Sequence, residues 1–152
     1  MNLHDTYSGL SGLEQLRAML ASGDRPPISA TLDFRLTEIE KGRAVVVGTP
    51  GAHAYNPLGA IHGGYAATML DTACGCAVHA SLSAEQAYTT LELKVSYHRG
   101  LTADSGPVRA EGIVTTIGRR VAFAEARLFD GGGRLCASAS STLLVFARTP
   151  EQ

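Results

Sequence analysis

The chain has 152 residues, of which 45% are hydrophobic, and its formal net charge at pH 7 is −1. This length and apolar fraction predict a single domain with a sizeable core over residues 28–150, preceded by an N-terminal helix and an extended segment over residues 1–27. The near-neutral charge provides no basic field of the kind that binds nucleic acid, so we expect no nucleic-acid partner.

The chain carries no sign of export or membrane insertion. Residues 1–7 have neither the basic residues nor the apolar run of a signal peptide. The longest apolar stretch, within residues 65–80, contains a carboxylate and is too short to span a bilayer comfortably. We therefore expect a cytoplasmic protein without a membrane partner. We interpret the cysteines as small buried residues, because their spacing fits neither a metal site nor a disulfide; they are Cys74, Cys76 and Cys136.

The first third of the chain predicts a helix and a β-hairpin. Residues 12–22 place apolar side chains at helical spacing after Ser11, a residue type that caps helices. Two prolines within residues 25–27 predict an extended segment, since each disfavours helical geometry in the residue before it. Near-alternation of apolar and polar residues over 28–47, with a turn at 41–43, predicts the hairpin.

The remainder predicts one long helix and four strands. Glycine and proline favour a loop up to about His62, and a run of small apolar residues favours a helix from there to about Leu82. The expected strands cover residues 87–99, 108–118, 121–130 and 134–147. In the strand over residues 87–99, the alternation of side chains predicts that the inner face carries Leu91, Leu93, Val95 and Tyr97. This order predicts an α+β fold in which an antiparallel sheet curls around the single helix.

Two features of the long helix indicate chemistry on a carbonyl group. The first N–H groups of a helix lack intrahelical partners and lie at the positive end of its dipole, so Gly63 and Gly64 offer an uncluttered place for a carbonyl oxygen. Asp71 is a carboxylate in an apolar helix, where burial is unfavourable unless the group is paired or functional. A purely structural alternative is that a neighbouring hydroxyl, for instance that of Thr68 or Thr72, satisfies this carboxylate.

The spacing of these two features predicts a homodimer. Asp71 follows Gly63 by eight residues, which is about 12 Å along a helix, so one carbonyl group cannot contact both. An antiparallel helix from a second copy would bring the Gly63 end of one chain to the Asp71 turn of the other, forming two shared sites. There the helix end would polarise a carbonyl, the carboxylate would activate water or attack directly, and Asn56 could donate an amide N–H. This combination suits hydrolysis of an acyl group.

Together these residues resemble a known family. Asn56, the run His62-Gly63-Gly64, and Asp71, in a strand, loop and long-helix context followed by four strands, resemble the hotdog-fold acyl-CoA thioesterases. The most similar type is the phenylacetate-degradation (PaaI-like) branch, which includes the thioesterase superfamily member 2 group, and the similarity covers about residues 30–147. The resemblance implies hydrolysis of an acyl- or aryl-CoA thioester to the free acid and CoA. It also implies a homodimer or a tetramer of two dimers, without a metal or redox cofactor, in which coenzyme A is part of the substrate.

The resemblance also implies roles for single residues. Asp71 would be the catalytic carboxylate, as general base or nucleophile, and the Gly63 N–H would bind the thioester oxygen. Asn56 and His62 would orient the thioester and its leaving sulfur.

A hydroxyl that positions the water is expected eighteen residues after Asp71, at Thr89. We predict Thr89 and not Thr90, which would face the other way on a strand. A related branch, which acts on 4-hydroxybenzoyl-CoA, has a further hydroxyl at about Cys74 or Gly75, where neither residue supplies one.

Other residues are candidates for binding the substrate. Guanidinium groups suit the CoA phosphates, and the local basic residues are Arg99, Arg119 and Arg120, for which a solvated turn is the alternative. We expect Gly64, Tyr65 and Met69 to line the substrate site, with the acyl pocket completed by the segment around Pro26-Pro27 and the N-terminal helix.

Two other functions compete with hydrolysis. A non-catalytic acyl-CoA-binding or regulatory hotdog protein would keep the binding tunnel without needing Asp71. A hotdog dehydratase would use a histidine with Asp or Glu, but His62 and Asp71, nine residues apart, match that pattern poorly. The sequence does not distinguish aryl from aliphatic acyl groups.

Overall fold

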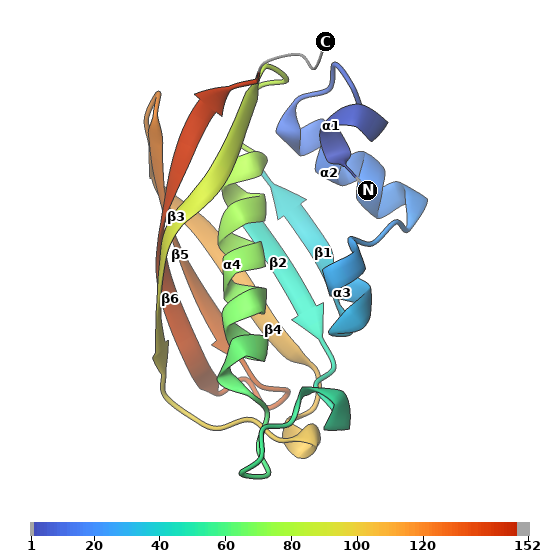
Figure 1. The fold of residues 1–152 in the computed structure, drawn as a ribbon, viewed down its shortest axis with the longest axis vertical. Coiled ribbons are helices and arrows are strands. Elements are labelled where there is room, and N and C mark those ends of the chain that lie inside the picture. The colour runs from blue at the N-terminus through green and yellow to red at the C-terminus, as the bar shows by residue number, and fades with distance from the viewer. Residues whose placement is uncertain (1, 149–152) are drawn as a thin grey trace.

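The computed structural model describes residues 2–148. One six-stranded antiparallel sheet curls around the long helix α4, and helices α1 to α3 lie together on the β1 side of the sheet (Figure 1). The helices are α1 (Leu3–Thr6), α2 (Gly12–Ser22), α3 (Pro27–Thr31) and α4 (Gly63–His79); the strands are β1 (Phe34–Glu40), β2 (Arg43–Gly48), β3 (Gln86–Tyr97), β4 (Val108–Ile117), β5 (Val121–Phe129) and β6 (Leu135–Ala147). The predicted α+β architecture is confirmed, whereas the predicted domain end at residue 150 lies outside the described residues.

The N-terminal segment is more helical than the sequence indicated. Helix α2 has its predicted bounds, and Ser11 caps it in a reciprocal pair of bonds with Glu14. The prediction of an extended segment is wrong from Pro27 onwards, because α3 starts there. Proline suits the first position of a helix, where its missing N–H would have no intrahelical acceptor. Helix α1 was not predicted.

The hairpin and the long helix follow the sequence pattern closely. Strands β1 and β2 pair as predicted, but the first strand begins at Phe34 and not at residue 28, because α3 occupies residues 27–31. Helix α4 begins at Gly63, with His62 as its N-cap, and ends at His79, three residues before the predicted Leu82. The backbone N–H groups of Ser81 and Leu82 bond three residues back instead, which tightens the last turn. None of the described helices is long and apolar enough to cross a membrane.

The strand order is β1-β2-β4-β5-β6-β3, so β3 reaches the far edge of the sheet and pairs with β6 alone. Helix α4 packs against the inner face formed by β2, β4 and β5. Met69 and Leu70 are fully buried in this layer, and burying such a side chain contributes about 1.5–3 kcal/mol. Gly112 of β4 meets the Ala73 backbone so closely that a Cβ atom would collide with it, so glycine lets the sheet approach the helix.

A β-bulge in β3 changes which of its side chains face the core. The pairing register with β6 shifts between Thr90 and Glu92, which leaves Leu91 as the extra residue. Leu91 is consequently 59% exposed, contrary to the predicted inner position. Before the bulge, Tyr88 and Thr90 take the inner face, because one extra residue reverses the alternation of side chains.

Candidate active site

The start of α4 leaves one backbone N–H group available. The His62 Nδ1 atom accepts a hydrogen bond from the Gly64 N–H at 2.8 Å, and the His62 carbonyl accepts one from the Tyr65 N–H at 2.9 Å. The Gly63 N–H has no acceptor among residues 2–148. Because this group lies at the positive end of the helix dipole, it is ready to donate to a ligand oxygen.

The cap also fixes the tautomer of His62. A nitrogen that accepts a hydrogen bond carries no proton, so the neutral ring has its proton on Nε2. The side chain is exposed, and the Nε2–H group can donate to a ligand. His62 therefore caps the helix and retains the donor that its predicted role requires.

Asn56 shapes the loop before α4. Its Oδ1 atom accepts hydrogen bonds from the Leu58 N–H at 2.9 Å and the Ala60 N–H at 3.2 Å, and its own N–H donates to the Ala60 carbonyl at 2.7 Å. Its Nδ2 group has no acceptor in the described part of the chain, so it can still donate as predicted.

Asp71 lies half-buried in the middle of α4. Its Oδ1 atom accepts a hydrogen bond from the Thr90 hydroxyl at 3.1 Å. The hydroxyls of Thr68 and Thr72 donate to the carbonyls of Gly64 and Thr68 instead, so the neighbouring hydroxyl that satisfies the carboxylate comes from Thr90 and from neither of these two residues. No ion pair within residues 2–148 involves Asp71.

The hydroxyl beside Asp71 is therefore that of Thr90, and the preference for Thr89 is corrected. Thr90 is paired with Leu143, which points into the core, whereas Thr89 is exposed on the outer face. Residues opposite each other in an antiparallel pair share a face of the sheet. The bulge at Leu91 produces this change of side.

A tyrosine occupies the space beside Gly75, one helical turn after Asp71. A Cβ atom at Gly75 would lie within 3.2 Å of Tyr88 Cζ and closer still to its hydroxyl. Tyr88 thus brings a hydroxyl from β3 to a position where the helix itself supplies none. Burial raises the pKa of the Cys74 and Cys76 thiols to about 12, with a smaller contribution from Asp71. Neither thiol is a nucleophile at neutral pH.

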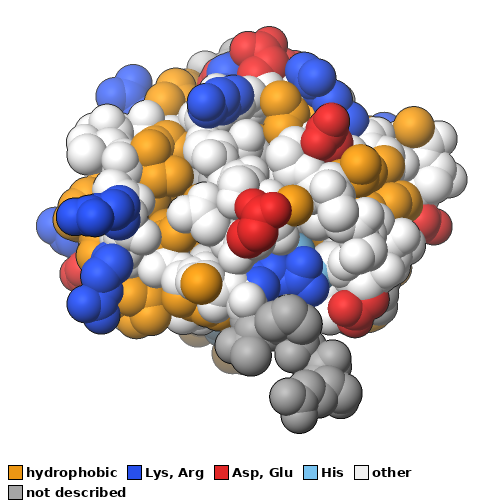
Figure 2. All heavy atoms as spheres, turned by 90° about the horizontal axis from the view of Figure 1, so that it is seen from above, with side chains coloured by type: hydrophobic (Ala, Val, Ile, Leu, Met, Phe, Trp, Pro, Cys, Tyr) orange, Lys and Arg blue, Asp and Glu red, His pale blue; other side chains and the backbone are white. Residues whose placement is uncertain are grey.

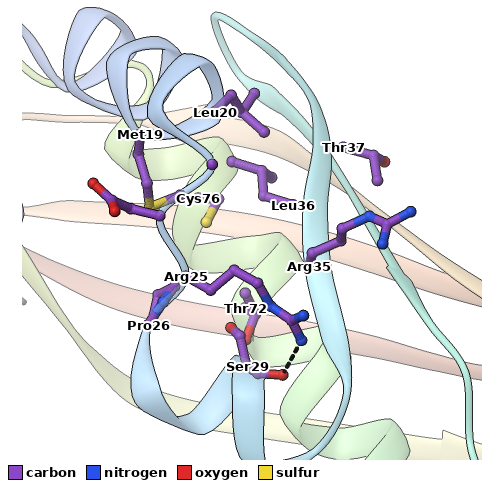
Figure 3. A pocket seen from close by; sticks show the side chains of 12 residues that line it. Met19, Leu20, Arg25, Pro26, Ser29, Arg35, Leu36, Thr37, Thr72 and Cys76 are labelled. Carbon is purple, nitrogen blue, oxygen red and sulfur yellow. Dashed lines mark hydrogen bonds between the residues drawn. The ribbon is translucent and has the colours of Figure 1, made fainter.

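Two of the pockets that adjoin α4 are lined by residues predicted to belong to the site. One, of about 220 Å³, lies at the helix start and is lined by His62, Gly63, Tyr97 and Arg99 among others. The other, of about 330 Å³, lies between α2, β1 and α4, where Met19, Leu36 and Cys76 face one another (Figure 3). Pro26 and Thr72 also line this second pocket, so it contains Pro26 and part of α2, two of the elements that were predicted to form the acyl pocket.

Tyr65 and Met69 lie in the core between α4 and the sheet and line neither pocket. The Tyr65 hydroxyl has no hydrogen-bond partner in the described residues. Burial is the main cause that raises its pKa to about 12.

The candidate phosphate-binding arginines are not together in one chain. Arg99 lies at the start of α4, whereas Arg119 and Arg120 lie in the β4–β5 turn at the opposite end of the molecule (Figure 1). Viewed from that end, basic and acidic side chains are scattered between apolar patches and form no single basic field (Figure 2). Residues 2–148 contain no group of three or more His, Cys, Asp or Glu placed to hold a metal ion.

Comparison with known proteins decides the family. A family model described as the thioesterase superfamily matches residues 58–137, which is more than half of the chain. The chain belongs to the thioesterase superfamily. The predicted resemblance to the PaaI-like hotdog thioesterases is confirmed. No curated protein matches the sequence.

Solved structures share the fold of this superfamily member. A thioesterase family protein from Silicibacter pomeroyi is 27% identical, with a TM-score of 0.77 over 88% of this chain and 98% of that one. A mutant of the phenylacetic acid degradation protein PaaI from Thermus thermophilus is 25% identical, with a TM-score of 0.71 over 78% and 98%. A Streptococcus mutans protein bound to acetyl-CoA is 21% identical, with a TM-score of 0.69 over 76% and 90%.

Proposed function

We propose that the protein hydrolyses a coenzyme A thioester at a site shared by two copies of the chain. The observation that carries the proposal is the combination of an available Gly63 N–H with the half-buried Asp71, which no cation in residues 2–148 neutralises. Superfamily membership supports thioester chemistry. The acetyl-CoA held by the Streptococcus mutans protein supports CoA as the carrier.

The surface of α4 supports a shared site. The residues of this helix that are not buried include a stripe of small side chains, to which Gly64, Ala67, Thr68, Asp71 and Thr72 belong. Strand β3 lies beside this stripe, since Thr90 contacts Asp71, and its outer edge is unpaired in the described chain. An unpaired edge strand readily pairs with another chain. A two-fold pairing of β3 with its copy would continue the sheet and set the two α4 helices side by side and antiparallel.

The same arrangement would bring together the basic residues that one chain keeps apart. In an antiparallel pair, the carboxyl end of the partner's α4 extends past the start of the first α4. The partner's β4–β5 turn, with its two arginines, would then approach Arg99. Such a cluster would suit the phosphates of CoA, because guanidinium groups bind phosphate oxygens through paired hydrogen bonds.

The chemistry follows from these positions. The Gly63 N–H would donate to the thioester oxygen and stabilise the negative charge that develops on it in the transition state. Asp71, oriented by Thr90, would remove a proton from water as its oxygen attacks the carbonyl carbon. The C–S bond then breaks, and the departing sulfur receives a hydrogen bond from His62 Nε2–H.

A second route uses the same atoms. Asp71 can attack the carbonyl carbon itself and form an anhydride that water then hydrolyses. A single turnover in ¹⁸O-labelled water that places label in the protein shows the anhydride route, because only attack of water on the Asp71 carbon of the anhydride labels the carboxylate. Label in the acid arises from direct hydrolysis and also from attack on the acyl carbon of the anhydride.

The test is Asp71→Asn on purified protein, with free thiol release measured for a panel of aryl- and acyl-CoA substrates. The amide keeps the shape but cannot accept the proton, so we expect kcat to fall by about 10²-fold to 10⁴-fold. Wild-type-like rates in this variant would exclude the assignment. Retained CoA affinity without turnover of any substrate by the wild type would favour the non-catalytic binding protein.

A further inference from the structure

A tyrosine at the end of β3 holds the start of α4. The Tyr97 hydroxyl donates a hydrogen bond to the Gly63 carbonyl at 2.7 Å. The ring lies directly beside the Gly63 Cα atom, because a Cβ atom there would lie 3.0 Å from both Cζ and the hydroxyl oxygen of Tyr97. Glycine at this position therefore leaves space for the ring.

This contact completes a restraint on both ends of one peptide group. The carbonyl of the Gly63–Gly64 peptide accepts from Tyr97, and its N–H donates to His62 Nδ1 at 2.8 Å. Glycine has the widest backbone freedom of any residue. Holding the Gly63–Gly64 peptide limits rotation about the backbone bonds of Gly63. The direction in which the Gly63 N–H points is therefore limited as well.

Burial does not explain the position of Tyr97. Its side chain is 56% exposed, so the ring gains less from burial than a core aromatic does. The specific interactions of the residue are the hydrogen bond to the Gly63 carbonyl and the packing of the ring on a glycine. Both concern the residue whose N–H is the proposed oxyanion donor, and Tyr97 also lines the pocket next to it.

We propose that Tyr97 is a positioning residue that aims the Gly63 N–H at the thioester oxygen, an inference that rests on the proposed hydrolytic function. Together with His62, it fixes the one free donor of the helix start before substrate binds. A donor fixed in advance stabilises the transition state more than the ground state, because no reorganisation is needed when charge develops. The loss of Tyr97 should therefore lower kcat and leave KM nearly unchanged.

The test compares Tyr97→Phe with Tyr55→Phe. Both tyrosines are partly exposed and both hydroxyls bond to the main chain, since Tyr55 accepts from the Ala103 N–H at 2.9 Å. We expect Tyr97→Phe to lower kcat about tenfold, the effect of one net hydrogen bond, with KM and the thermal midpoint close to wild type. Tyr55→Phe should keep the wild-type kcat.

A double variant separates positioning from a general structural effect. Gly63→Ala keeps the N–H, but its Cβ displaces the Tyr97 ring. Adding Tyr97→Phe to Gly63→Ala should therefore lower kcat hardly any further than Gly63→Ala does alone. Three results would each overturn the proposal. They are an unchanged kcat in Tyr97→Phe, a change in KM without a change in kcat, and a further tenfold fall in kcat when Tyr97→Phe is added to Gly63→Ala. Hydrolysis itself is tested separately, because these results leave the Asp71→Asn outcome unaffected.

Discussion

Gly63 offers a way to remove one backbone donor without disturbing the helix. We predict that Gly63→Pro lowers kcat by about 10²-fold to 10³-fold relative to Gly63→Ala, the usual cost of one oxyanion-hole donor. Gly63 is the first residue of α4, where proline is well tolerated because the N–H it lacks has no intrahelical acceptor. His62 already has φ −61° and ψ 136°, an extended geometry that suits the residue before a proline.

Gly63→Ala is the matched control for this substitution. Both variants add a Cβ atom that presses on the Tyr97 ring, but only proline removes the N–H. The assay is thiol release under saturating acyl-CoA, with helix content and thermal midpoint measured on the same samples. Equal kcat values for two folded variants would refute the argument that the Gly63 N–H stabilises the transition state.

Two further predictions concern Thr90 and His79. Thr90→Val should lower kcat about tenfold by removing the hydroxyl bonded to Asp71, whereas Thr89→Val, on the outer face, should not; the reverse result would restore the choice made from spacing. Burial lowers the pKa of His79 from 6.5 to about 4, so the unfolded chain binds a proton more readily, and unfolding free energy falls as the pH drops below about 6.5. We expect urea titrations to show that the free energy of unfolding falls by about 2 kcal/mol between pH 7 and pH 5, and that this fall is largely absent in His79→Gln. An equal fall in His79→Gln would contradict the assignment of the pH dependence to His79.

The fold was predictable where local patterns and long-range packing agree. Ser11 and the helical spacing after it predicted α2. The glycines and proline of the loop before His62, with the small apolar run that follows it, predicted the start of α4. The prediction failed at Pro27, where a proline can start a helix as readily as it ends one. The position of β3 at the sheet edge also depends on long-range pairing with β6, which a pattern along one strand does not contain.

The candidate site was predictable on the helix and less so on the strand. Gly63 and Asp71 lie on one continuous helix, whose regular geometry fixes their separation from the sequence alone. Thr89 was preferred for its spacing from Asp71, and Thr90 was set aside because regular alternation would turn it to the other face; the bulge at Leu91 interrupts that alternation. Tyr97 was assigned to the inner face correctly, but its contact with Gly63 depends on how the strand end crosses the helix start.

The most direct test of the account is complementation between two inactive variants. Asp71→Asn and Gly63→Pro are unfolded together and refolded as an equal mixture, so that half of the dimers contain one chain of each kind. If every site combines Gly63 of one chain with Asp71 of the other, each mixed dimer has one intact site. The mixture should then recover about a quarter of the wild-type kcat per chain. Activity no higher than the mean of the separate variants, with mixed dimers confirmed by native mass spectrometry, would contradict the shared site.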